Sequence, residues 1–288
     1  MLFMYWIIRF SSKARVFIRK NTIMSVELSI LAFVIGTALF PESIATHDPV
    51  TQDSGSIMMS PNGDHYFGTD WAGRDVFSRV VHGSSVSLYI GLISVALASV
   101  IGISVGMLSA YKGGYIDLII QRVTDIFLGF PAIVMALVII VSMGSSQNSI
   151  SLAIAIGMAP QVVRLSRSSA LSVKENLYID AIESVGANPS RIIFMHLLPN
   201  SFPVILSQIT GYLGVAIVAE TTLSFLGLGM PPPYPSWGRM IQEGSQKYME
   251  SAPWVTIFPG AALSITVITL LSLGDSIRDL IGPKDRPA

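Results

Sequence analysis

Residue types that could carry catalysis are scarce in this sequence, and their spacing fits no common catalytic or metal site. There is no cysteine, which excludes disulfides, thiolate nucleophiles and cysteine metal sites. The histidines lack the spacing of a zinc site, and we interpret His47, His65 and His82 as structural. No lysine follows a glycine, so the phosphate-binding motif G-x-x-x-x-G-K-[ST] is absent. We therefore expect no enzyme active site, no bound metal and no cofactor in this chain.

Charged side chains of both signs gather between residues 67 and 79. Their short spacing allows a cluster of paired charges, together with a helix cap and a glycine that permits a tight turn. We interpret this segment as an ordered external elbow that leads into a helix, rather than as a ligand site. The residues expected to form it are Gly68, Thr69, Asp70, Gly73, Arg74, Asp75 and Arg79, with Thr69 or Asp70 as the helix cap.

Glu220 is the one Asp, Glu, Lys or Arg between Arg191 and Arg239. A charge at the centre of a bilayer costs about 2.5–3.5 kcal/mol on insertion scales. Glu220 should therefore face the bundle interior or a watery path, or lie near the outer boundary. Two interpretations stay open: a pathway or gate residue, and a packing carboxyl bonded to threonine or to the backbone.

A short segment from Tyr178 to Val185 predicts a helix in a polar loop. Its isoleucines and Val185 lie at helical spacing and predict one apolar face. Gly186 can end the helix by adopting positive φ, and Pro199 suits the first turn of the next helix. Ala181 is small enough for a partner to approach closely. The candidate residues of this element are Tyr178, Ile179, Asp180, Ala181, Ile182, Glu183, Val185, Gly186 and Pro199.

The elements that position these residues are predicted to be membrane helices. Apolar residues make up 51% of the chain, charged residues 12%, and the mean hydropathy is +0.61. A soluble domain would carry about 25% charged residues. The uncharged stretch between Ile126 and Arg164 exceeds the roughly 20 residues of one crossing, and the polar turn Gly144–Ser149 divides it. Six spans are predicted: Ile23–Phe40, Ser85–Ala110, Ile119–Val141, Ile150–Val163, Phe202–Leu226 and Val255–Leu273.

The distribution of lysine and arginine predicts the orientation. Most of these residues fall on the side of the N-terminus, so the positive-inside rule favours cytoplasmic N- and C-termini. Net charge is zero, and no nucleic-acid partner is expected. The predicted organisation is a cytoplasmic N-terminus (1–22), a first helix (23–40), an external segment (41–84), a transmembrane domain (85–275) with a cytoplasmic loop (164–200), and a cytoplasmic tail (276–288).

Four blocks of sequence resemble those of ABC importer permeases. Tyr178–Gly186, with Leu198 and Pro199 after it, resembles their EAA loop, although Asp180 replaces the glutamate and Ile182 the second alanine. The other blocks are similar to runs of the dipeptide, oligopeptide and nickel permeases, in the same order. They are Phe67–Arg79, Ala219–Gly238 and Phe258–Leu280. The resemblance extends from about Asp64 to Leu280.

This resemblance implies an all-α type I ABC importer transmembrane fold of six helices, in the cytoplasmic (inner) membrane of a prokaryote. The chain would be the second permease of a dipeptide or oligopeptide system, and it would work by alternating access. Tyr178–Gly186 would be the coupling helix that docks on an ATPase. The implied partners are a homologous permease, two ATP-binding subunits that hold ATP and Mg, an extracytoplasmic solute-binding protein, and membrane lipid. Asp275, Arg278 and Asp279 would anchor the C-terminal helix.

Three alternatives stay open at this stage. A nickel or metal-chelate importer would have the same architecture and differ in cargo. An ion-coupled secondary transporter predicts inverted repeats and matched intramembrane carboxylates, whereas Glu220 stands alone. A non-transporting scaffold would leave the long cytoplasmic loop without a role.

Overall fold

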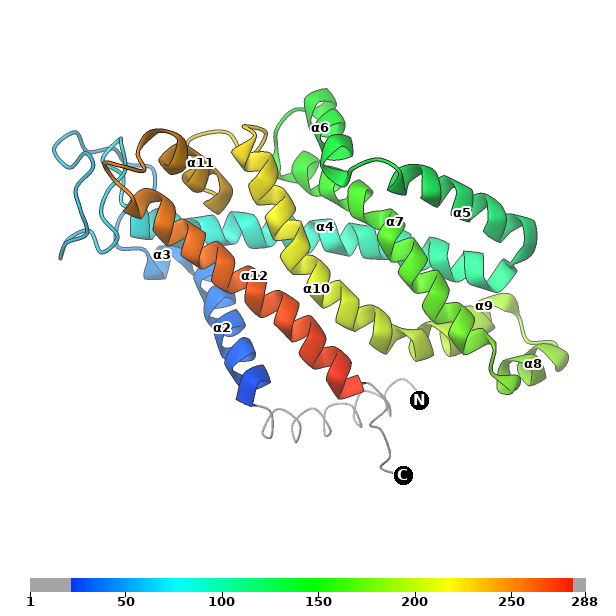
Figure 1. Ribbon diagram of the computed structural model, residues 1–288. Coiled ribbons are helices and arrows are strands. Elements are labelled where there is room, and N and C mark those ends of the chain that lie inside the picture. The colour runs from blue at the N-terminus through cyan, green and yellow to red at the C-terminus, as the bar shows by residue number, and fades with distance from the viewer. Residues whose placement is uncertain (1–21, 282–288) are drawn as a thin grey trace.

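The computed structural model describes residues 22–281, and the regular elements in this range are all helices (Figure 1). Parts of the predicted cytoplasmic N-terminus (1–22) and tail (276–288) lie outside these residues. The helices are α2 (Thr22–Leu39), α3 (Pro41–Ile44), α4 (Val76–Lys112), α5 (Gly114–Leu128), α6 (Ala132–Met143), α7 (Gln147–Lys174), α8 (Leu177–Ser184), α9 (Pro189–Ile192), the π-helix η1 (Ile193–Leu197), α10 (Leu198–Phe225), α11 (Trp237–Lys247) and α12 (Trp254–Ile281). The predicted all-helical class is confirmed.

Within residues 22–281, five helical stretches are long and apolar enough to cross a membrane. They are α2, α4, α7, α12 and the continuous run Pro189–Phe225, which joins α9, η1 and α10. The helices α5 and α6 make a sixth candidate span only as a pair bent by 83°. The prediction of one unbroken helix at Ile119–Val141 is therefore wrong. Pro131 explains the break, because proline has no N–H to donate and disfavours helical backbone at the residue before it.

Helix α4 begins nine positions before its predicted span, at Val76 rather than Ser85. The Asp75 side chain caps it by accepting a hydrogen bond from the Ser78 backbone N–H at 2.7 Å. Helix α7 likewise runs on to Lys174, beyond the predicted Val163. Polar residues continue both helices past their apolar runs. Hydropathy alone therefore places the start of α4 too late in the sequence and the end of α7 too early.

The turn between α6 and α7 is confirmed where it was expected. Gly144 has φ +80°, and the Ser146 side chain caps α7 through a capping box with Ser149. The segment between α10 and α12 contains a helix that the sequence did not predict, α11. The Ser236 hydroxyl caps it by accepting from the Arg239 backbone N–H at 3.3 Å.

The centre of the bundle is the contact between α4 and α7, with α10 and α6 packed around it. A Cβ on Gly102 would lie 2.4 Å from the Val162 Cβ, and one on Gly106 would lie 2.6 Å from the Val163 carbonyl oxygen. Only glycine allows these two helices to approach so closely. Small residues at such contacts are typical of packed membrane helices.

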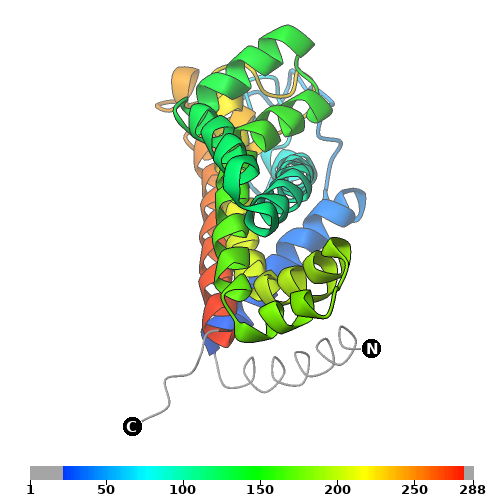
Figure 2. The ribbon, with the colours of Figure 1, turned by 90° about the vertical axis from the view of Figure 1, so that its right-hand side faces the viewer.

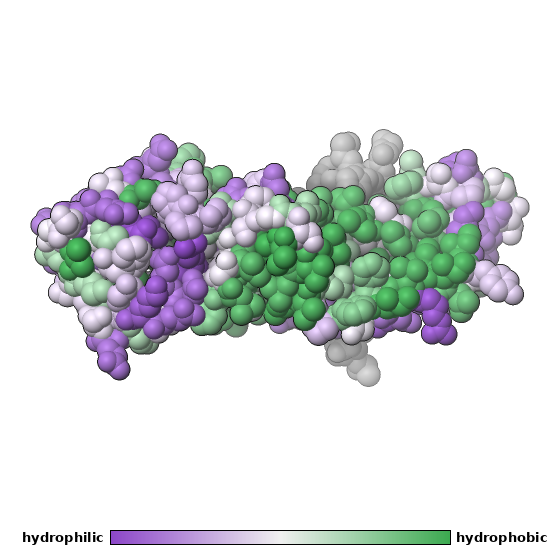
Figure 3. All heavy atoms as spheres, turned by 90° about the horizontal axis from the view of Figure 1, so that it is seen from above, coloured by the Kyte–Doolittle hydropathy of each residue, from purple (hydrophilic) through white to green (hydrophobic). Residues whose placement is uncertain are grey.

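The face of the bundle seen in Figure 3 is apolar across its middle and hydrophilic toward both ends. Large apolar side chains are exposed on α5, α6 and α12, including Ile119, Val138 and Ile268. Exposed apolar surface of this extent is typical of helices that face lipid or partner helices. The bundle therefore suits a bilayer, with two polar ends in water.

Candidate functional site

Helix α8 forms close to the predicted range and lies at one polar end of the molecule. Figure 2 shows α8 and α9 along the lower edge of the bundle, at the same end as the start of α2 and the end of α12. The loop over residues 45–75 and α11 lie at the other end (Figure 1). The long loop predicted between the fourth and fifth spans therefore contains two short helices.

The inner face of α8 takes part in a hydrophobic cluster with residues of α9 and of the ends of three long helices. Ile179 is fully buried in a cluster with Met107 of α4, Ala170 of α7 and Ile205 of α10. Ile182 packs against the same cluster. Displacement of α8 would therefore press on the ends of α4, α7 and α10 together, because a close-packed interior transmits strain.

Polar contacts also join the helices around α8 to one another and to α8. Lys174, the last residue of α7, donates to the Tyr111 carbonyl at 2.8 Å and to the Ala110 carbonyl at 3.2 Å. These carbonyls belong to the last turn of α4, where a cation is favourable. The Tyr178 phenol oxygen accepts from the Asn200 amide at 3.3 Å, and partial desolvation raises the pKa of this phenol above its ordinary value.

The outer face of α8 presents apolar side chains to solvent. Leu177 is 84% exposed and Val185 is 82% exposed, and Ala181 lies exposed between them at helical spacing. The prediction that Ile179, Ile182 and Val185 form one apolar face is therefore wrong for Val185, because Ile179 and Ile182 pack inward while Val185 is exposed. Val185 comes directly after the last residue of α8, so its side chain does not continue the inner face of the helix.

Gly186 ends α8 as predicted, with φ +79°. Its N–H donates to the Glu183 carbonyl at 2.9 Å, and the next N–H, of Ala187, reaches the Ile182 carbonyl at 3.3 Å. No atom lies within 4 Å of where a Cβ on Gly186 would stand. Glycine is needed here for backbone conformation, not for space. Asp180 and Glu183 point away from the bundle and are exposed.

Pro199 lies in the first turn of α10, as predicted, but α10 is not a separate helix there. It follows directly on η1, and the helix is continuous from Pro189. Because Pro199 cannot donate a backbone hydrogen bond, the wider turns of the π-helix just before it accommodate the missing bond. The end of the loop thus joins α10 without a flexible hinge.

Glu220 has no exposed surface and lies between α10 and α4. One carboxyl oxygen accepts from the Ser224 hydroxyl at 2.7 Å and the other from the Ser87 hydroxyl at 3.3 Å. The Ser236 and Thr221 hydroxyls lie near the same carboxyl group, so its surroundings are hydroxyl groups of α10, α4 and the residue before α11. The carboxyl joins two spans through hydroxyl groups that suit an apolar setting.

The charged residues of the external elbow come together around Asp70 and Asp75. Asp70 accepts from the Arg74 guanidinium at 2.7 Å, and Arg79 lies 3.5 Å away. Asp70 also accepts from the Ala72 backbone N–H at 2.8 Å, whereas Thr69 accepts from the Met59 N–H at 2.8 Å. The prediction that Thr69 or Asp70 caps a helix is therefore wrong.

Asp75 is the helix cap, because it comes directly before the first residue of α4. Gly68 and Gly73 have φ of +72° and +74°. A Cβ on Gly73 would stand 1.8 Å from the Asp53 carbonyl oxygen, so the loop closes over this glycine. The elbow is thus an ordered structure built on buried charges and tight turns.

The terminal residues Asp275, Arg278 and Asp279 are exposed on α12. Within residues 22–281 they form no ion pair with one another or with other residues. The neighbouring Ser276 instead donates to Glu27 of α2 at 2.9 Å.

Three interhelical contacts escaped sequence reasoning. Glu27 is buried in the first span and bonds to Ser272 and Ser276 of α12. Two ion pairs join α5 to α7: Arg167 to Asp117 at 2.6 Å, and Arg164 to Asp125 at 2.6 Å. A lone carboxyl inside the first apolar run was the available signal for Glu27, by the same logic that singled out Glu220.

Comparison with known protein families gives one match. Residues 98–286 match the family described as "Binding-protein-dependent transport system inner membrane component". The match takes in α8, Glu220 and the terminal residues.

Similar proteins cover nearly the whole chain. A "Dipeptide transport system permease protein DppC" of Alkalihalophilus pseudofirmus is 37% identical over 93% of this chain and 88% of its own length. A "Probable D,D-dipeptide transport system permease protein DdpC" of Escherichia coli is 38% identical over 96% of this chain and 93% of its own length. A "Glutathione transport system permease protein GsiD" of Pectobacterium atrosepticum is 36% identical over 94% and 89%.

Solved structures share the fold at lower sequence identity. One is described as "Inward facing conformations of the MetNI methionine ABC transporter", with a TM-score of 0.60 and 20% identity over 71% of this chain and 97% of that one. Another, "Crystal structure of an amino acid ABC transporter with histidines", gives 0.54 and 16% identity over 69% and 92%.

Proposed function

This chain belongs to the family of binding-protein-dependent transport system inner membrane components, and we propose that it is one of two permease subunits of an ATP-driven peptide importer. It is a membrane-embedded permease component of an ABC transporter, and components of this kind are not themselves catalytic. The proposal adds a cargo, a set of partners and a means by which ATP drives transport.

The observation that carries the proposal is the two-faced packing of α8. Its inner face is locked into the cluster around Ile179, and its outer face presents Leu177, Ala181 and Val185 without a partner among residues 22–281. An exposed apolar ridge on a rigidly held helix suits insertion into a groove of another protein. We assign that groove to an ATPase subunit on the cytoplasmic side, one copy under each of two permeases.

The ATP-driven movement would pass through α8 as a lever. Closure of the two ATPases brings the two docked α8 helices together, and the attachment to α4, α7 and α10 carries this displacement into the spans. Rigid-body movement of this kind would alternate access between the two sides. ATP and Mg bind to the partners in this scheme, and this chain supplies the conduit.

The cargo is proposed from the relatives. Those 36–38% identical over most of their length are named for dipeptide, D,D-dipeptide and glutathione transport. We infer a small peptide, delivered by an extracytoplasmic binding protein. The half-pathway in this chain would be completed by a homologous second permease.

The test is peptide uptake by vesicles that contain this chain, a second permease and two ATPase subunits of the same organism, with the binding protein outside. We expect uphill uptake of a labelled dipeptide that requires ATP and every component. Uphill uptake without the ATPases would contradict the coupling. Uptake of a nickel chelate but no peptide would contradict the cargo.

A Gly186→Val variant tests the role of α8 in the same vesicles. Valine at φ +79° should cost about 1–2 kcal/mol and distort the end of the helix. We expect loss of ATPase co-purification and of uptake, with normal insertion in the membrane.

Gly113→Val is the matched control for this variant. Gly113 also has positive φ and open space around its Cβ position, but it lies in the turn between α4 and α5. It should retain ATPase binding. Equal loss in both variants, or no loss in Gly186→Val, would contradict the assignment of α8.

A further inference from the structure

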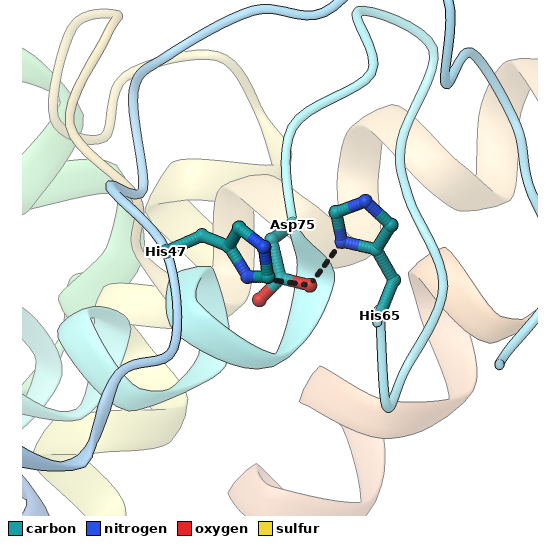
Figure 4. A group of neighbouring side chains, drawn as sticks. All are labelled: His47, His65 and Asp75. Atoms are coloured by element: carbon teal, nitrogen blue, oxygen red, sulfur yellow. Dashed lines mark hydrogen bonds and ion pairs between the residues drawn. The ribbon is translucent and has the colours of Figure 1, made fainter. Parts of the chain in front are cut away.

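Two histidines and an aspartate meet at the external end of the bundle. Figure 4 shows His47 and His65 on either side of Asp75, each on a separate stretch of backbone. One ligand atom from each residue lies within 4.8 Å of the others. The His65 Nδ1 is 2.9 Å from the Asp75 Oδ1, and the His47 Nδ1 is 3.9 Å from that oxygen.

The backbone holds these three side chains in place. The His47 backbone N–H donates to the Ser78 hydroxyl at 2.9 Å, which ties this loop to the first turn of α4. The His65 backbone N–H donates to the Asn62 side chain at 2.9 Å. Asp75 uses its Oδ2 to cap α4 at Ser78, so its Oδ1 remains free to face the two imidazoles.

The charge of Asp75 has no permanent counterion. Its side chain is 1% exposed, and no lysine or arginine within residues 22–281 forms an ion pair with it. The adjacent arginines, Arg74 and Arg79, both turn to Asp70. Among residues 22–281, the ionisable groups within 4 Å of its carboxyl oxygens are the two imidazoles. A buried carboxylate in such a setting favours a bound cation.

We propose that His47, His65 and Asp75 bind a divalent transition-metal ion of the zinc, nickel or cobalt class. The ligands are the two Nδ1 atoms and the Asp75 Oδ1, since imidazole nitrogen with a carboxylate oxygen suits these metals. In this arrangement the His65 Nε2 carries the ring proton, and the lone pair of the His65 Nδ1 is available to the ion. The His47 side chain is 42% exposed, compared with 15% for His65, so water can complete the coordination on the His47 side.

The ion would act as a clamp on the external segment. His47 follows α3, His65 lies in the loop before the elbow, and Asp75 begins α4. A shared ion would fasten both loops to the first turn of α4 and thereby order the surface that faces outward. This clamp is independent of the peptide cargo, because it lies outside the spans and concerns the fold of the elbow.

The test is metal binding by the purified full chain in detergent, prepared without a histidine tag. Titration with Zn²⁺ followed by calorimetry should give one ion per chain, and Co²⁺ should give a visible absorption band. His47→Gln and His65→Gln should each weaken binding at least about tenfold. Asp75→Asn should also weaken it, although asparagine can still cap α4.

Two histidines outside the cluster provide the controls. His82→Gln changes another histidine at the same end of the molecule, and His196→Gln changes one at the α8 end. Both variants should bind zinc as the wild type does. The proposal is overturned if wild-type protein binds no zinc up to about 100 μM, or if the His47→Gln/His65→Gln double variant binds it undiminished.

Discussion

At the scale of single residues, buried carboxyl groups with hydroxyl partners are the most informative feature of this bundle. Glu220 touches no solvent and bonds to one serine of its own helix and one serine of α4. A hydroxyl can donate to a carboxyl oxygen whatever the protonation state of the carboxyl group. Such a contact can therefore hold two spans together without a compensating cation.

Substitution of Glu220 separates packing from transport. Glutamine keeps the shape and one acceptor oxygen, so Glu220→Gln should retain peptide uptake and stay within about 1 kcal/mol of wild-type stability. Glu220→Ala leaves the Ser87 and Ser224 hydroxyls without this partner and should lower the free energy of unfolding by about 1–3 kcal/mol. Chemical denaturation in detergent, with uptake measured in vesicles, checks both.

The exposed Glu250 serves as the control, and Glu250→Ala should change neither quantity. A Glu220→Gln protein that is stable but fails to transport would reject the packing role. It would instead assign Glu220 to the pathway, the other interpretation that the sequence leaves open.

At the scale of elements, hydropathy and turn chemistry predict most of the fold but not where helices break or continue. The runs that become α2, α4, α7, α10 and α12 are visible as charge-poor stretches. The break between α5 and α6 is not, because both sides of it are equally apolar. Pro131 and Gly129 were the local signal, and they outweigh the continuous hydropathy around them.

The sequence likewise predicts some features of the candidate site and misses others. Local rules predict that Gly186 ends α8 and that Ile179 and Ile182 lie on one apolar face, which packs inward. They fail for Val185, because α8 ends at Ser184 and Val185 therefore does not lie on the same helical face as Ile179 and Ile182. They also miss the cluster of His47, His65 and Asp75, whose members are 28 positions apart or fewer but meet only through the folding of loops. The spacing of these three residues along the chain therefore does not predict that their side chains come together.

The contact between α2 and α12 gives a prediction at this scale. Glu27 accepts from Ser276 at 2.9 Å and also from Ser272, and it is the buried polar link between these two helices. Glu27→Ala should loosen α2 and lower the free energy of unfolding by about 1–3 kcal/mol. Hydrogen exchange in detergent should then increase over residues 22–39 more than over α4.

The matched control is Ser29→Ala on the same helix. The Ser29 side chain is exposed and donates only to the Ser25 carbonyl of its own helix at 2.8 Å. Its loss should leave exchange in α2 unchanged. If Glu27→Ala behaves like this control, the carboxyl does not hold α2 in place.

At the scale of the whole molecule, two polar ends with different character flank an apolar middle (Figure 3). One end is built from tight turns and buried ion pairs, with Arg74 and Arg79 satisfied by Asp70. The other bears α8 with an exposed apolar ridge. The positive-inside rule assigns the α8 end to the cytoplasm, where an ATPase would meet it.

This orientation can be tested directly because the chain has no cysteine of its own. Ser54 and Ser190 are both exposed, the first in the loop over residues 45–75 and the second in α9 beside α8. A membrane-impermeant maleimide applied to spheroplasts should label Ser54→Cys at once. It should label Ser190→Cys only after the membrane is permeabilised. The reverse pattern would put α8 on the outer side, where no ATP is available, and would remove the basis for coupling through this helix.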